Sequence, residues 1–281
     1  MDLDYLSPEE REMLMALSLE QKIIQSKKVI RTALEKFGPK KLAIAWTGGK
    51  DSTLMLWLYR QICNELGITI PACMFIDEGD QFEEIEDFVD RVKKEWNIPL
   101  VVVKNTDVSS KAGAVGDIIK VNDLNERNRR EIELLDFKDK TFPFEPESYL
   151  CNHLMKTVVM NKFIEDNELQ AVSTAIRWDE QDARSQEEYF SSRHNSNPEH
   201  TRAHPILHFK ERDIWDATFK YNIPFCTLYY KGYRSLGVKS NTSKSSDLPA
   251  WEQDFENSSE RSGRGQDKED IMSKLRDLGY M

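Results

Sequence analysis

A short apolar run that ends in two glycines is the feature that most constrains how this chain folds. The run covers residues 41–46 and lies between Gly38-Pro39 and Gly48-Gly49. Short apolar segments bounded by turn residues are typical of strands buried in a parallel sheet. From Ser52 to Gly67, apolar side chains then recur at helical spacing. The sequence therefore predicts a strand, a sharp turn and a helix in direct succession.

The same alternation of strands and helices continues along the chain. We expect further strands at 72–76, 100–103, 171–175 and 204–207, and further helices at 83–96, 151–167 and 211–221. Strands that alternate with helices at this spacing favour an α/β fold with a doubly wound parallel sheet.

The two ends of the chain differ from this pattern. Residues 8–37 read as two helices with a break near Ser18, and Ser7 is the expected N-cap of the first helix. The stretch 105–148 is polar and reads as an irregular excursion that covers a site. Glycine, serine, lysine and aspartate dominate from Ser235 onward, which predicts an extended tail or flexible loop. We therefore expect an α/β domain over 1–234, with a helical lead-in at 1–38, and a C-terminal tail over 235–281.

Composition narrows the class of protein. The chain has 281 residues, a hydrophobic content of 39% and a net charge of −10. No apolar run approaches the roughly 18 residues of a membrane span, and the acidic start lacks the features of a signal peptide. We expect a cytoplasmic protein with no membrane partner. Its acidity argues against a protein that coats nucleic acid non-specifically.

The four cysteines are scattered. They are Cys63, Cys73, Cys151 and Cys226, with no CxxC pair. A disulfide framework or a zinc site is therefore not expected.

The turn after the first strand has the chemistry of an anion site. It reads Thr47-Gly48-Gly49-Lys50-Asp51-Ser52. Glycines let the backbone approach a ligand closely, and the amides at the start of the following helix favour an anion. Lys50 adds positive charge, while Thr47 and Ser52 add hydroxyl groups. The loop is not a Walker motif, because Asp51 follows the lysine where that motif has serine or threonine.

Charged residues follow three other predicted elements. Asp77 comes at the end of the second strand, where a carboxylate can bind Mg²⁺ or a ribose hydroxyl. Arg177 and Arg184 follow the strand at 171–175, and paired guanidinium groups suit an oxyanion. Asp179, between them, can orient the arginines or a cation. Arg234 lies in a glycine-containing stretch after the last predicted helix.

The loop closely resembles the SGGxDS loop of the ATP pyrophosphatase family, with Thr47 in place of the usual serine. Residues 177–184 are similar to an A-R-R-D-E-x-x-x-R segment of sulfate adenylyltransferase small subunits, and Trp178 replaces one arginine. The stretches 202–215 and 222–237 also resemble family segments. The ending, at 259–264 and 278–280, resembles the S-E-R-Q-G-R…G-Y-F terminus of the same subunits.

The resemblance implies that the loop grips the β- and γ-phosphates of ATP while a nucleophile attacks the α-phosphorus. It implies ATP and Mg²⁺ as cofactors. The catalytic candidates are Lys50, Asp51, Arg177 and Arg184. The candidates for ATP binding are Thr47, Gly48, Gly49, Ser52, Asp77, Asp179 and Arg234, and those for metal binding are Asp51 and Asp77.

The resemblance leaves the acceptor open. An adenylyltransferase that acts on sulfate or another oxyanion fits the ending and the 177–184 segment best, and such a subunit works with a separate GTPase subunit. The alternative is activation of DNA or tRNA for sulfur insertion, with nucleic acid and sulfur-transfer proteins as partners and Cys151 as the sulfur carrier. Sulfonucleotide reduction fits least, because the tail has no cysteine. We expect an oligomer in either case.

Overall fold

The two N-terminal helices begin where the sequence predicts them. The computed structural model describes residues 5–181, 184–194 and 196–264, and in it helix α1 spans Pro8–Met15 and helix α2 spans Leu19–Phe37. The Ser7 hydroxyl accepts a hydrogen bond from the backbone N–H of Glu10, and the Glu10 carboxylate accepts one from the Ser7 N–H. Ser18 caps α2 through the same reciprocal arrangement. These caps satisfy N–H groups that a helix start otherwise leaves unpaired.

A six-stranded sheet forms the centre of the molecule, in the order β3-β2-β1-β6-β8-β7. Every neighbouring pair is parallel except β7 with β8, so the predicted α/β fold with a mostly parallel sheet is confirmed. Ile44 of β1 lies opposite Cys73 of β2 on one side and Ser173 of β6 on the other. The strands are β1 (Leu42–Ala45), β2 (Ala72–Asp77), β3 (Leu100–Lys104), β6 (Ala171–Ser173), β7 (Phe190–Arg193) and β8 (His200–Ala203).

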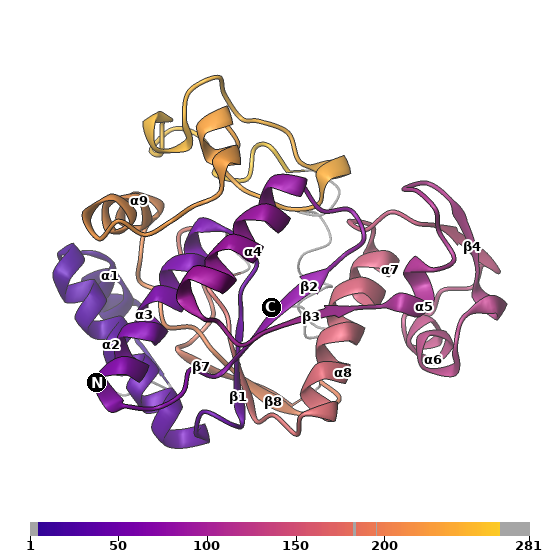
Figure 1. Ribbon diagram of the computed structural model, residues 1–281, viewed down its shortest axis with the longest axis horizontal. Coiled ribbons are helices and arrows are strands. Elements are labelled where there is room, and N and C mark those ends of the chain that lie inside the picture. The colour runs from indigo at the N-terminus through magenta and orange to yellow at the C-terminus, as the bar shows by residue number, and fades with distance from the viewer. Residues whose placement is uncertain (1–4, 182–183, 195, 265–281) are drawn as a thin grey trace.

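Helices cover both faces of this sheet (Figure 1). Alternate residues of β1 face opposite layers: Leu42 and Ile44 join the larger apolar core with α2, α3, α4 and α9, while Ala43 packs with Met160 of α8. Because the chain leaves β1 towards β2 and later returns to β6 on the other side, the carboxyl end of β1 lies where the winding reverses. Ligands bind at this point in open α/β sheets. The helices are α3 (Lys50–Leu66), α4 (Glu83–Trp96), α8 (Val158–Asp166) and α9 (Glu211–Lys220).

The stretch 105–148 is not irregular, as the sequence suggested, but forms a small unit at one side of the molecule (Figure 1). It consists of α5 (Thr106–Ser109), β4 (Ile118–Lys120), the 3-10 turn η1 (Val121–Asp123), α6 (Glu126–Leu134) and β5 (Thr141–Pro143). Strands β4 and β5 pair antiparallel. The unit has its own apolar cluster, which includes Ile119, Ile132 and Phe142. The chain then enters α7 (Tyr149–Asn152) and a π-helical turn, η2 (His153–Thr157).

The predicted strand at 204–207 was wrong, and strands β4, β5, β7 and β8 were not predicted. Residues 204–207 form a buried turn, and the strand is β8, just before them. Two polar residues of β8, His200 and Arg202, are buried, and the Arg202 Nε donates to the His200 Nε2 at 2.9 Å. The apolar pattern therefore could not locate β8, because its buried side chains include polar ones that satisfy one another.

The segment after α9 lies against the body of the domain instead of extending from it. It contains the 3-10 turns η4 (Thr227–Lys231), η5 (Lys239–Asn241) and η6 (Ala250–Glu252), and it crosses one end of the molecule beside α4 (Figure 1). The family-like ending at 278–280 lies outside the described residues.

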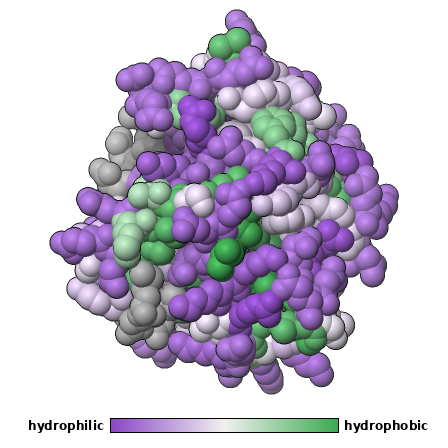
Figure 2. Space-filling view, turned by 90° about the vertical axis from the view of Figure 1, so that its left-hand side faces the viewer, coloured by the Kyte–Doolittle hydropathy of each residue, from purple (hydrophilic) through white to green (hydrophobic). Residues whose placement is uncertain are grey.

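The surface offers little extended apolar area on the face shown in Figure 2, which is mostly hydrophilic with small hydrophobic patches. Within the described ranges, no helix combines the length and apolar character needed to cross a membrane.

Candidate active site

The loop between β1 and α3 has a shape that depends on glycine. Gly48 has φ of 74°, and a Cβ atom placed on it would lie 2.9 Å from Cγ2 of Val89 and 3.1 Å from Cγ2 of Ile85, both in α4. A side chain at this position therefore meets both backbone strain and a clash. Gly49 is the N-cap of α3 and provides no side-chain cap. The amides of Asp51 and Ser52 in the first turn of α3 are thus available to a ligand.

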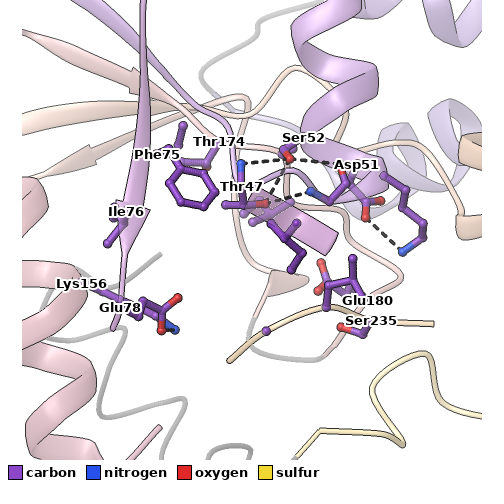
Figure 3. Close-up of a pocket in the computed structure, with 18 of the residues that line it drawn as sticks. Thr47, Asp51, Ser52, Phe75, Ile76, Glu78, Lys156, Thr174, Glu180 and Ser235 are labelled. Atoms are coloured by element: carbon purple, nitrogen blue, oxygen red, sulfur yellow. Dashed lines mark hydrogen bonds and ion pairs between the residues drawn. The ribbon is translucent and has the colours of Figure 1, made fainter. Parts of the chain in front are cut away.

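The two hydroxyl groups of the loop lie together (Figure 3). The Oγ1 of Thr47 and the Oγ of Ser52 are 3.1 Å apart, and the Thr47 N–H donates to the Ser52 Oγ at 3.2 Å. The backbone N–H of Lys50 donates to the Tyr229 hydroxyl at 2.8 Å, which fixes the start of the helix against the segment after α9. The loop is therefore held in shape before any ligand binds.

A cavity of about 290 Å³ opens at this loop. Its walls come from the loop, the end of β2, the π-helical turn, residues 174–176 and the segment after α9 (Figure 3). One wall is apolar, with Met74, Phe75 and Ile76 from β2. The cationic side chains that line the cavity are Lys50, Lys156, Arg184, Arg202, Arg261 and Arg264, and the acidic ones are Asp51, Glu78, Glu180 and Glu260.

Lys50 is held by carboxylates. Its side chain is 1% exposed, and its Nζ lies 3.1 Å from Asp51 Oδ2 and also donates to Glu260 Oε1. Although burial alone opposes a charged amine, the charges of Asp51, Glu260 and Glu211 raise the pKa of Lys50 well above its ordinary value. The loop lysine is therefore a fixed cation that the C-terminal segment (residues 235–264) reaches through Glu260.

Glu260 also pairs with Arg177. The Arg177 guanidinium is fully buried and donates to three carboxylates, namely Asp51, Glu260 and Asp179, with a distance of 2.9 Å from its Nε to Asp179 Oδ1. Burial by itself raises the pKa of the Glu260 carboxyl, but the charges of Arg177 and Lys50 hold it well below its ordinary range. Arg177 does not line the cavity, and its three donor positions serve to organise these carboxylates.

Asp179 and Arg234 extend this network towards α9. The Asp179 Oδ2 accepts from the Glu211 N–H at 2.9 Å, and burial raises the pKa of Asp179. The Arg234 Nη2 donates to Glu211 Oε2 at 2.7 Å, and its Nη1 donates to the Ser258 Oγ at 2.7 Å. Neither Asp179 nor Arg234 lines the cavity. Asp179 connects Arg177 to the start of α9, and Arg234 connects α9 to the C-terminal segment.

Arg184 does reach the cavity. It pairs with Glu180, whose other oxygen, Oε1, lies 3.2 Å from Arg261 of the C-terminal segment. The Arg184 Nε is buried and has no hydrogen-bond partner among the described residues. Of the two arginines that the sequence proposed as an anion clamp, Arg184 is thus the one placed to meet a ligand.

Asp77 lies outside the cavity lining, whereas its neighbour Glu78 lines it. The Asp77 Oδ1 accepts from the Gly79 N–H at 2.8 Å, and its Oδ2 pairs with Lys104 at 2.8 Å. Both oxygens of Asp51 also have cationic partners, Arg177 and Lys50. Among the described residues, no group of three or more histidine, cysteine or acidic side chains forms a metal centre. Metal binding by Asp51 and Asp77 stays a prediction.

Cys151 is remote from this chemistry. Its side chain is fully buried, its Sγ lies 3.5 Å from the Pro143 carbonyl oxygen, and it does not line the cavity. Burial raises the pKa of the Cys151 thiol above its ordinary value. A thiol of this kind is inert, because the thiolate is the reactive form.

Sequence reasoning missed several residues of this site. Glu260, Tyr229, Lys156 and Arg264 all lie in stretches that were recognised, but no role was given to them. The signal that could have found Glu260 is its place in Ser259-Glu260-Arg261, the stretch that resembles the small-subunit ending. The contacts of these residues join segments far apart in the chain, and the sequence does not show which segments meet.

Comparisons with known proteins identify the family of this chain. Residues 41–244 match the phosphoadenosine phosphosulfate reductase domain family, so the chain belongs to that family. It is 23% identical to a probable FAD synthase of Schizosaccharomyces pombe over 81% of this chain and 70% of that protein. It is 25% identical to sulfate adenylyltransferase subunit 2 of Zymomonas mobilis over 78% of this chain and 69% of that protein.

The fold also occurs in a solved adenylyltransferase. The crystal structure of Candida glabrata FMN adenylyltransferase in complex with FMN and the ATP analogue AMPCPP superposes with a TM-score of 0.58 and 19% identity, over 92% of this chain and 79% of that one. The relatives therefore include adenylyltransferases with different acceptors.

Proposed function

We propose that this chain transfers the adenylyl group of ATP to a compact oxyanion and releases pyrophosphate, most like a sulfate adenylyltransferase small subunit. The observation that carries the proposal is the cavity at the carboxyl end of β1, where a helix start without a side-chain cap and two loop hydroxyls share the lining with six cationic and four acidic side chains. Such a site suits a polyanion on one side and an anionic nucleophile on the other.

The loop fits the phosphates of ATP. The amides of Asp51 and Ser52 and the hydroxyls of Thr47 and Ser52 supply donors, and Gly49 leaves room for a phosphate to approach. A Cβ atom at Gly49 would project to within 3.3 Å of the Thr47 Oγ1 and 3.6 Å of the Tyr229 hydroxyl, into the space that these groups surround. Phe75 and Ile76 offer an apolar surface for the base.

Magnesium, in this proposal, arrives with the nucleotide. Mg²⁺ is usually bound by one or two carboxylates together with substrate phosphates. Asp51 lines the cavity, but both of its oxygens have cationic partners, so it can contribute a ligand only if Lys50 or Arg177 shifts. When bound, the ion would neutralise the charge that develops on the leaving pyrophosphate.

The size of the cavity favours a small acceptor. The volume of about 290 Å³ lies just below the roughly 300–1,000 Å³ that is usual for small-molecule pockets, and ATP occupies part of it in this proposal. Beside ATP, sulfate needs less room than the flavin ring of FMN. Formation of an adenylyl sulfate is unfavourable, and a separate GTPase chain is the proposed means of coupling.

FMN is the second candidate acceptor, and the similarity to FAD synthases is what favours it. The phosphate group of FMN is also an oxyanion, so the same cationic side chains of the cavity can bind either acceptor. Sulfur insertion into nucleic acid through Cys151 has weaker support, because that thiol is buried away from the cavity.

The test is pyrophosphate release from ATP in the presence of sulfate, of FMN or of neither, with Mg²⁺ and with inorganic pyrophosphatase to remove the product. We expect stimulation by sulfate, loss of the stimulation in Arg184→Ala, and little change in Cys151→Ser. Arg91→Ala, at an exposed arginine of α4, is the matched control. Stimulation by FMN alone would select the second acceptor. ADP and free phosphate as the main products of α-labelled ATP would refute adenylyl transfer.

A further inference from the structure

The C-terminal segment is fixed in place at the level of its backbone. The Ser243 N–H donates to the Gly263 carbonyl oxygen at 2.8 Å, and Thr242 forms an antiparallel bridge with Arg264. A Cβ atom at Gly263 would lie only 2.3 Å from the Ser243 carbonyl oxygen, so the two backbone stretches approach more closely than a side chain at residue 263 allows. The position of Arg264 is thus set by two paired stretches of backbone.

The side chain of Arg264 is also fixed by its contacts. Its guanidinium lines the cavity, and its side chain is 6% exposed. It lies directly against Gly237, where an added Cβ atom would come within 2.1 Å of its Cζ and both terminal nitrogens. Its Nη2 donates to Glu147 Oε1 at 3.1 Å. Glycine at 237 is therefore what allows this guanidinium to occupy its place.

The π-helical turn brings a second cation to the same end of the cavity. Lys156 lies 2.5 Å from Glu78 Oε2 and 3.3 Å from Glu147 Oε1, so Glu147 bridges Lys156 and Arg264. Figure 3 shows Lys156 and Glu78 together, away from the group formed by Thr47, Asp51 and Ser52. The cavity thus has a second lysine–carboxylate group, apart in space from the one at the phosphate loop.

An unpaired hydroxyl of the next residue in the turn also lines the cavity. Thr157 lines the cavity and is 1% exposed, and its Oγ1 has no hydrogen-bond partner within the part of the chain that the structure describes. A buried hydroxyl without a partner is unfavourable unless a ligand or water satisfies it. This hydroxyl, the Lys156 ammonium and the Arg264 guanidinium supply the donors that a tetrahedral oxyanion accepts.

We infer that this end of the cavity is the acceptor subsite, in which Arg264 of the C-terminal segment binds the anionic group of the acceptor opposite Lys156 and Thr157. Gly237 is a positioning residue, because it acts through Arg264. The inference rests on the proposed function and adds to it the residues that select the acceptor. The ligand chemistry is a tetrahedral dianion, which exists as free sulfate, as free phosphate and as the phosphate group of FMN.

The test measures binding alone, so it does not depend on turnover. Wild-type protein saturated with AMPCPP is titrated in a calorimeter with sulfate, with inorganic phosphate and with FMN. We expect at least one of these anions to bind. We expect Arg264→Gln and Gly237→Ala to weaken that binding at least tenfold, while the affinity for AMPCPP stays within twofold. Arg264→Lys should recover part of the loss, since it keeps the charge without the planar guanidinium.

Gly113→Ala is the matched control, because its Cβ atom would meet only an oxygen of Asp117, at 3.3 Å, on the exposed part of the small unit. If Gly237→Ala unfolds, Arg264→Gln decides the matter. Unchanged anion binding in Arg264→Gln would overturn the inference, and so would an equal loss of AMPCPP and anion binding. Failure of all three anions to bind the wild-type complex would overturn it as well. A protein that binds the anion but releases no pyrophosphate would refute the proposed function and leave the subsite standing.

Discussion

Replacement of Glu260 by glutamine tests the link between the C-terminal segment and the phosphate loop. The Glu260 carboxylate accepts hydrogen bonds from two buried cations, Lys50 and Arg177. Loss of one partner from a buried ion pair costs about 3–5 kcal/mol, and a hydrogen bond to a charged group contributes about 1.5–3 kcal/mol. Glutamine keeps one carbonyl acceptor but turns an amide donor towards the other cation. We therefore expect Glu260→Gln to lower the free energy of unfolding by about 3 kcal/mol.

The loss should be visible in thermal unfolding. For a domain of this size, about 1 kcal/mol corresponds to a shift of roughly 2–4 °C in Tm, so the variant should unfold about 6–12 °C below the wild type. The matched control is Glu256→Gln, at an exposed glutamate of the same segment. Urea unfolding at pH 7 gives the free energy directly. A loss of less than about 0.5 kcal/mol, the usual size for a surface substitution, would show that these ion pairs do not hold the segment.

The pH dependence of the same variant adds a second test. The pKa of Glu260 is depressed in the folded protein, so its stabilising effect is complete above the unfolded pKa of about 4.3 and is lost as the pH falls below that value. The difference in unfolding free energy between the wild type and Glu260→Gln should therefore be constant from pH 7 to pH 5 and shrink at lower pH. A difference that instead grows on acidification would contradict the assignment.

Two further predictions concern the glycines of the phosphate loop and the buried side chain of His208. Gly48→Ala should destabilise the fold, because the positive φ and the 2.9 Å distance from an added Cβ atom to Val89 leave no room for a methyl group. Gly49→Ala should unfold at the same temperature as the wild type but lose ATP binding. Equal melting temperatures for the two variants would refute this distinction. Burial lowers the pKa of His208 to about 4, below an unfolded value of about 6.5. As the pH falls from about 6.5 to about 4, this residue should therefore lower the free energy of unfolding by about 1.4 kcal/mol per pH unit. His208→Gln should remove this contribution in urea titrations at several pH values.

Local patterns in the sequence predicted the framework of the fold. The strand, loop and helix at residues 42–66 follow from an apolar run, two glycines and helical spacing, all of which lie within one short stretch. The capping serines Ser7 and Ser18 were equally readable, since their partners lie three residues away. Strand β8 was not, because His200 and Arg202 are buried in a strand that apolar periodicity does not mark.

The site was harder to predict than the fold. The loop and Arg184 line the cavity, as expected for residues that meet a ligand, but Arg177, Asp179 and Arg234 bond to protein groups behind it. In a sequence, an arginine that binds a ligand looks the same as one that binds a carboxylate. The distinction depends on where a distant acidic residue such as Glu260 is placed, and the carboxylate is 210 positions from Lys50.

That separation also bears on how the chain is synthesised and folds. Contacts between residues so far apart form late, because a long loop must close before they contribute any free energy. During synthesis the sheet can begin to assemble on the ribosome before the Glu260 carboxylate is there to pair with Lys50 and Arg177. The cavity acquires its last wall only when residues 260–264 have emerged and docked, so a nascent chain passes through a stage with an assembled sheet and an open, hydrated nucleotide loop.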